Sequence, residues 1–97
     1  MNKFTIQLTR AAQKDLNRLG FEDPDHISQD LQTLKENPFG RPPRIKRLKG
    51  FSFPLYRLRS GGFRVLYRVD ELVITVMRII DRKDLESTLR RLQEKKT

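Results

Sequence analysis

The 97-residue chain contains no cysteine, and this absence removes several kinds of site at once. Disulfides, thiolate chemistry and zinc sites built on cysteine are all excluded. A secreted domain of this size usually relies on disulfides for stability, so we expect a cytoplasmic protein. The chain also lacks an apolar run near the roughly 20 residues of a membrane-spanning helix, and no apolar segment follows the charge near Met1. We therefore expect no membrane partner and no signal peptide.

Histidine is almost absent as well, because His26 is the only one in the chain. A lone histidine in a polar part of a predicted helix is typical of a solvated residue rather than a catalytic one. The histidine, aspartate and glutamate residues form no cluster with the spacing of a metal site. Gly61 and Gly62 fit a turn better than a phosphate-binding loop, which would open a helix. We therefore expect neither a metal nor a small-molecule cofactor.

Acidic residues are missing from one long window, between Glu36 and Asp70. The chain has 21 Lys and Arg against 12 Asp and Glu, which gives a net charge of +9. The window contains Arg41, Arg44, Lys46, Arg47, Lys49, Arg57, Arg59, Arg64 and Arg68. Charge of one sign gathered in one region favours an anionic partner. Nucleic acid is the leading interpretation, and an acidic protein partner or a plain solvated surface are the alternatives.

The hydrophobic pattern predicts a single α+β domain over residues 1–97, since this length leaves no room for a second core. A first strand at 3–9 precedes two helices, the first capped by Thr9 and stopped by Gly20, the second begun by Asp23 and Pro24. Four strands and a last helix are predicted at 45–49, 55–60, 63–69, 72–80 and 83–95. The order β-α-α-β-β-β-β-α predicts a twisted, mostly antiparallel sheet with the N-terminal helix pair on one face and a C-terminal helix.

The segment 57-RLRSGGFRVLYR-68 predicts a β-hairpin with a Ser-Gly-Gly turn and four arginines in twelve residues. Side chains alternate along a strand, so Arg57 and Arg59 share one face. Arg64 and Arg68 lie on the same face if the hairpin register allows it. Guanidinium groups match phosphate oxygens in pairs, so phosphate binding is the leading use of such a face.

Two further arginines are candidates to join this face. Arg78 and Arg82 stand near the end of the last predicted strand. For Arg82 the alternative is a local ion pair with Asp81 or Asp84. Tyr67 has the opposite strand parity to the arginines, and we expect it in the core.

Three segments of the chain resemble the RelE/ParE superfamily of toxins from bacterial and archaeal toxin–antitoxin modules. They are 46-KRLKG-50, 56-YRLRSGGFRVLYRVD-70 and 73-VITVMRIIDRKDL-85. The resemblance covers almost the whole chain and implies the RelE-like fold, whose order of elements is the one predicted above. It also implies one of two activities. RelE-like toxins cleave messenger RNA in the ribosomal A site without a metal, whereas ParE-like toxins poison DNA gyrase. In both branches a cognate antitoxin wraps and silences the toxin.

The resemblance to the RelE-like branch also implies a set of site residues. The catalytic positions are Lys49, Arg57, Arg59, Arg64 and Arg82, and the RNA-binding positions are Arg44, Lys46, Arg47, Arg68 and Arg78. In this chemistry the 2′-hydroxyl of the RNA attacks the adjacent phosphorus and leaves a 2′,3′-cyclic phosphate. Arg64 and Arg82 suit stabilisation of the charge on the phosphorane. Lys49 is predicted to be the only lysine near the site that can lose a proton, since neighbouring cations lower a lysine pKa.

Two positions depart from the pattern of the family. Glu86 stands where the family has a tyrosine, and Asp81 stands where it has a histidine before the arginine. A role for Glu86 on the helix surface is favoured over a role as general base, because RNA phosphates repel a carboxylate. The leading hypothesis is a RelE-like endoribonuclease that acts on translated mRNA and arrests translation. A ParE-like gyrase inhibitor and a binding-only toxin homologue are the alternatives.

Overall fold

The computed structural model describes residues 3–19 and 24–94, and its order of elements is the predicted one. The strands and helices are β1 (Thr5–Leu8), α1 (Arg10–Leu19), α2 (Pro24–Glu36), β2 (Ile45–Leu48), β3 (Leu55–Ser60), β4 (Phe63–Asp70), β5 (Val73–Asp81) and α3 (Leu85–Glu94). A 3₁₀ turn, η1 (Arg82–Asp84), joins β5 to α3. Thr9 caps α1 as predicted, because its Oγ1 accepts a hydrogen bond from the Ala12 N–H at 3.1 Å. The predicted roles of Gly20 and Asp23 lie outside the described residues.

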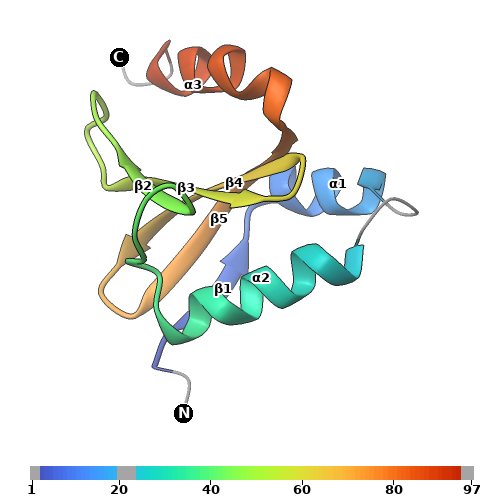
Figure 1. The fold of residues 1–97 in the computed structure, drawn as a ribbon. Coiled ribbons are helices and arrows are strands. Elements are labelled where there is room, and N and C mark those ends of the chain that lie inside the picture. Colours follow the sequence, from blue (N-terminus) through green and yellow to red (C-terminus); the bar gives the residue numbers. More distant parts are fainter. Residues whose placement is uncertain (1–2, 20–23, 95–97) are drawn as a thin grey trace.

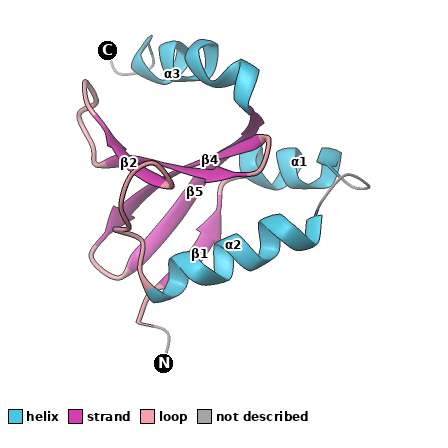
Figure 2. Cartoon of the chain, viewed as in Figure 1, coloured by secondary structure: helices cyan, strands magenta, loops and turns pink. Residues whose placement is uncertain are grey.

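All five strands form one sheet in the order β1-β5-β4-β3-β2 (Figure 2). β1 runs parallel to β5, and the other three neighbouring pairs are antiparallel. The sheet is therefore mostly antiparallel, as the sequence predicts. β1 and β2 are its two edges, and the α1–α2 segment carries the chain from one edge to the other.

The main core lies between the sheet and the helices α1 and α2, which run in opposite directions across one face (Figure 1). Its buried members are Ala12, Ile27, Leu31, Leu34, Ile45, Leu58, Val65, Tyr67, Val69, Ile74, Val76 and Ile79. Tyr67 is fully buried, and its hydroxyl donates to the Pro38 carbonyl at 2.7 Å. A buried hydroxyl needs such a partner, and the predicted core position of Tyr67 is confirmed.

α3 covers part of the opposite face of the sheet (Figure 1). There the buried residues Leu55, Leu66 and Ile80 form a smaller core, and the partly buried residues packed on it include Phe51, Phe53, Leu85, Leu89 and Leu92. The leucines of α3 follow the helical spacing that the sequence shows, so one side of the helix meets this core. Within the described part of the chain, no helix is long and apolar enough to cross a membrane.

Candidate nucleic-acid interface

The register of the β3–β4 hairpin brings its arginines onto one face. Arg59 lies directly opposite Arg64, and Arg57 lies opposite Leu66, a member of the small core under α3. Residues opposite each other in antiparallel strands point to the same side of a sheet. Arg57, Arg59 and Arg64 therefore all project from the face that α3 partly covers, which is the register that the predicted phosphate-binding face requires.

A backbone hydrogen bond holds Arg82 next to the turn that carries these arginines. Its N–H donates to the Gly62 carbonyl at 3.0 Å, which ties the end of β5 to the turn of the hairpin. The Asp81 carboxylate accepts the Lys83 N–H at 3.0 Å and so caps η1. Arg82 forms no ion pair with Asp81 or Asp84, all three being described residues, so the local ion pair that the sequence left open does not form.

Electrostatic coupling identifies one set of four residues, Arg57, Arg59, Arg64 and Arg82, which we call the arginine cluster. Burial lowers the pKa of Arg64, and the charges of Arg59 and Arg82 lower it further against an opposing effect of Asp81. Burial, followed by the charges of Arg64 and Arg59, also lowers the pKa of Arg57. These arginines repel one another, and a bound polyanion would relieve that repulsion.

Backbone carbonyls, rather than carboxylates, hold the inner members of the arginine cluster. Arg64 is only 8% exposed, and its Nη1 donates to the carbonyls of Gly61 at 3.0 Å and Phe63 at 2.8 Å. Arg57 donates from Nη2 to the Pro43 carbonyl at 2.9 Å, while its buried Nε has no partner. Arg59 and Arg82 are exposed. A neutral acceptor orients a guanidinium without cancelling its charge, so the cluster stays strongly positive.

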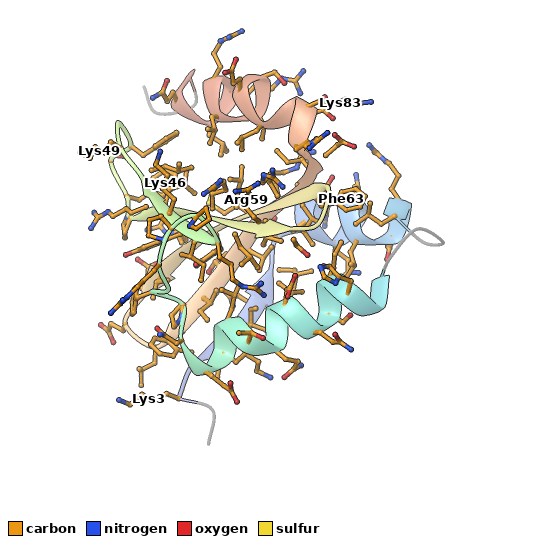
Figure 3. The ribbon with its side chains drawn as sticks, in the orientation of Figure 1. Lys3, Lys46, Lys49, Arg59, Phe63 and Lys83 are labelled. Carbon is orange, nitrogen blue, oxygen red and sulfur yellow. The ribbon has the colours of Figure 1, made fainter. Side chains whose placement is uncertain are left out.

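The lysine beside the cluster is Lys46 rather than Lys49. β2 pairs with β3 so that Lys46 lies opposite Arg57, on the same face as the cluster. Arg44 lies opposite Arg59, and the end of β2 at Leu48 is roughly 13 Å further along the strand. Figure 3 shows Lys49 still further out, in the loop after β2, with Lys46 between it and Arg59. The expectation that Lys49 is the only lysine near the site is therefore wrong.

Three other arginines of the predicted RNA-binding set have carboxylate partners. Arg44 binds Asp30 at 2.6 Å, Arg68 binds Asp70 at 2.8 Å, and Arg78 binds Asp15 at 2.7 Å. The expectation that Arg68 and Arg78 add free charge to the cluster is therefore wrong. Two of the partners come from helices α1 and α2, which lie far away in sequence.

Arg78 pairs with Leu66 beside an irregularity in the sheet. The pairing of β4 with β5 shifts between Leu66 and Tyr67, so that strand alternation is interrupted near Arg78. Arg78 then reaches the Asp15 carboxylate with both Nε and Nη2, at 2.7 and 3.0 Å, and Asp15 also accepts the Ile79 N–H at 2.9 Å. Asp15 raises the pKa of Arg78, mainly through these hydrogen bonds. This ion pair fastens α1 to the sheet.

A groove of about 570 Å³ runs between β2 and α3. It is lined by Lys46, Arg47, Leu48, Lys49, Phe51, Glu86, Leu89, Arg90 and Gln93. Four of these side chains are basic and one is acidic, so the groove extends the positive surface from the cluster toward the loop between β2 and β3. Sequence reasoning missed Arg90, because a charged residue on an exposed helix face gives no sign of what lies across from it. Glu86, where the family has a tyrosine, lines this groove.

No group of three or more His, Asp or Glu side chains in residues 3–19 and 24–94 can hold a metal ion. His26 lies 3.3 Å from the Asp30 carboxylate, with which Arg44 and Ser60 also interact. The guanidinium and ammonium groups of the cluster face can bind phosphate, stabilise developing negative charge and transfer a proton.

Comparison with known proteins gives relatives in sequence and in structure. Residues 6–86 match the family model described as ParE toxin of type II toxin-antitoxin system, parDE. A Methanocaldococcus jannaschii protein named "Putative toxin RelE1" is 37% identical over 84 residues, covering 84% of this chain and 92% of the relative.

Solved structures show the same fold at lower identity. The archaeal RelE-RelB complex from Pyrococcus horikoshii contains a chain with a TM-score of 0.70 and 24% identity, covering 82% of this chain and 96% of that one. The DinJ-YafQ complex of E. coli contains another with a TM-score of 0.70 and 12% identity, covering 84% and 97%.

Proposed function

The chain belongs to the ParE toxin family of the RelE/ParE superfamily, and we propose that it is a ribosome-dependent, metal-independent endoribonuclease that cleaves mRNA and arrests translation. The observation that carries this proposal is the arginine cluster, whose four guanidiniums form no ion pair with a carboxylate among the described residues. Such a cluster suits the phosphates of an RNA backbone, which guanidiniums bind in pairs.

The proposed reaction is self-cleavage of the bound RNA. The 2′-oxygen attacks the adjacent phosphorus, the bond from phosphorus to the 5′-oxygen breaks, and a 2′,3′-cyclic phosphate remains. Arg64 and Arg82 stabilise the added negative charge of the phosphorane, and Arg57 and Arg59 hold the flanking phosphates. Fixed donors lower the barrier when they bind the charge of the transition state more strongly than the ground state. Equal binding of both states would not lower it.

Lys46 is the proposed proton donor to the departing 5′-oxygen. It lies opposite Arg57 and lines the groove between β2 and α3, which places its ammonium group on the face of the cluster. A lysine ammonium is the ordinary form at neutral pH and has a proton to give. The proton of the 2′-hydroxyl passes to water. Lys49 and Arg47, which line the same groove, are proposed to bind the RNA backbone further from the scissile phosphate.

We propose a cognate antitoxin as the protein partner, which places the chain in the cytoplasm with its ribosomal substrate. Two of the structural relatives were solved as complexes described as a toxin with its antitoxin, RelB-RelE of Methanococcus jannaschii and DinJ-YafQ of E. coli. An acidic antitoxin segment would complement the net charge of +9. Masking the cluster would silence the nuclease.

Gyrase inhibition is the second candidate, and the description of the matching family model favours it, because that model is named for ParE. The two candidates separate in the test tube. A gyrase inhibitor blocks supercoiling of relaxed plasmid and leaves ribosome-bound mRNA intact, whereas the proposed nuclease does the reverse.

The variants Arg64→Ala and Arg82→Ala test the proposed site. Loss of one group that stabilises developing charge commonly costs about 10²–10³ in rate, so both variants should relieve growth arrest when expression is induced. Arg41→Ala is the matched control, because Arg41 is an exposed arginine outside the cluster. Both variants should still fold. Full toxicity of both variants would show that the site assignment is wrong.

A further inference from the structure

Asp30 is a buried carboxylate on the face of the sheet opposite the arginine cluster. It belongs to α2, and its side chain is only 9% exposed. Oδ1 accepts a hydrogen bond from Arg44 Nη2 at 2.6 Å, and Oδ2 accepts one from Ser60 Oγ at 2.6 Å. His26 Nε2 lies 3.3 Å from Oδ2. Both oxygens of the carboxylate are therefore engaged, and they connect α2 to the end of β3 and to Arg44 just before β2.

Both partners of Asp30, Ser60 and Arg44, are direct neighbours of Arg59. Ser60 follows Arg59 in β3 and, by strand alternation, points toward α2 while Arg59 points toward α3. Arg44 immediately precedes the neighbouring strand β2, and its carbonyl accepts the Arg59 N–H at 2.8 Å. Asp30 is thus hydrogen-bonded to Ser60, which follows Arg59 in the chain, and to Arg44, whose carbonyl accepts the Arg59 N–H. If this end of β3 rotated, or shifted relative to α2, at least one of these two hydrogen bonds of Asp30 would break.

The hydrogen bond between Asp30 and Ser60 also affects Arg64 and Arg82, through the turn of the β3–β4 hairpin. Ser60 is the last residue of β3, pairs with Phe63, and is 1% exposed. The two glycines between them carry carbonyls that hold arginines: Gly61 accepts from Arg64 Nη1, and Gly62 accepts from the Arg82 N–H. A turn fixed at Ser60 therefore fixes the acceptors that orient Arg64 and Arg82.

We propose that Asp30 is a positioning residue for the arginine cluster and sets the geometry of RNA cleavage from behind the sheet. Its carboxylate does not touch the RNA, since it is buried on the α2 side, and it acts through Ser60 and Arg44. This inference rests on the proposed nuclease function for its effect on rate. The placement of Arg82 by the Asp30–Ser60 contact does not depend on that function and can be measured without RNA.

Two variants separate positioning from general stability. Asp30→Asn removes the negative charge that pairs with Arg44 and accepts the hydrogen bond from Ser60. Ser60→Ala removes only the link to the turn and leaves the carboxylate paired with Arg44. Tyr67→Phe is the control, because it deletes the buried hydrogen bond to the Pro38 carbonyl, away from the turn. Each protein is compared with the unaltered chain in hydrogen–deuterium exchange of the Arg82 amide and in cleavage of mRNA on a programmed ribosome.

We expect Asp30→Asn and Ser60→Ala to speed exchange of the Arg82 amide by tenfold or more relative to amides in the middle of β4. Cleavage at saturating toxin should slow by about tenfold to a hundredfold, since small misplacement of reacting groups has effects of this size. The toxin concentration at half-maximal rate should change by less than about threefold, because Arg59 stays exposed for binding. Tyr67→Phe should change global stability without either effect.

The proposal is overturned if Ser60→Ala leaves both the Arg82 exchange rate and the cleavage rate unchanged. It is also overturned if both variants merely follow Tyr67→Phe, with losses that scale with global stability. If the unaltered protein cleaves no mRNA, the proposed function fails, and the exchange comparison alone still decides whether Asp30 positions Arg82.

Discussion

Replacing Arg59 with glutamine should make the free protein more stable while it weakens the binding of RNA. Arg59 lies opposite Arg64, and its charge is one of the causes that lower the pKa of both Arg64 and Arg57. Removing one of several mutually repelling cations relieves the others. The side chain of Arg59 has no carboxylate partner in the described residues, so no attractive ion pair is lost in exchange.

The size of the gain follows from the geometry of the hairpin. Two unit charges about 7 Å apart repel by about 2 kcal/mol at an effective dielectric constant of about 20. Arg59 is exposed, so solvent and salt reduce this figure toward the roughly 0.2–1 kcal/mol typical of cross-strand pairs. A gain of about 1 kcal/mol raises the melting temperature of a domain of this size by about 4–8 °C.

Thermal unfolding at two salt concentrations tests this prediction. The Debye length is about 30 Å at 0.01 M salt and about 3 Å at 1 M, so the gain from Arg59→Gln should be large in the first buffer and nearly absent in the second. Arg41→Gln is the matched control, because it removes the same charge from an exposed arginine outside the cluster. Equal melting temperatures for the two variants at low salt would refute the idea that repulsion among the arginines of the cluster destabilises the folded protein.

Two further predictions concern other charges of the site. Asp15→Asn leaves Arg78 without its buried partner and should lower the free energy of unfolding by about 2–3 kcal/mol, at the low end for broken buried pairs because Arg78 is partly exposed, as denaturant titration can measure. Unchanged stability would contradict this role. Arg64→Lys puts a lysine where burial and neighbouring cations disfavour charge, so its pKa should fall below the ordinary value of about 10.4. RNA affinity of this variant should decline more steeply than that of the unaltered protein as pH rises from about 8 to 10, and parallel profiles in filter binding would oppose the claim.

The parts of the site that sequence reasoning found are those set by local rules. Strand alternation is enough to place Arg57 and Arg59 on one face and Tyr67 on the face opposite to Arg64, and the observed register of the hairpin then puts Arg64 beside Arg59. Helical spacing likewise placed Leu85 and its partners in α3 against the sheet. These features depend on residues close together in the chain, so a sequence contains them directly.

The parts that sequence reasoning missed depend on residues far apart in the chain. No partner for Arg44 or Arg78 was apparent from the sequence, yet Asp15 lies 63 positions before its partner Arg78, and Asp30 lies 14 positions before Arg44. The choice between Lys46 and Lys49 depends on how β2 pairs with β3 across a loop whose length fixes no register. Asp30 itself gave no signal, because an aspartate within a polar helix usually faces solvent.

The most direct test of the central claim is to map the 3′ ends of mRNA on a programmed ribosome after incubation with the protein and a chelator. The account predicts cuts within the A-site codon, a 2′,3′-cyclic phosphate at the new end, and no cuts in free mRNA. Loss of these cuts in Arg64→Ala would link them to the arginine cluster. Intact mRNA in the presence of active protein, together with blocked supercoiling in a gyrase assay, would contradict the account and establish the second candidate instead.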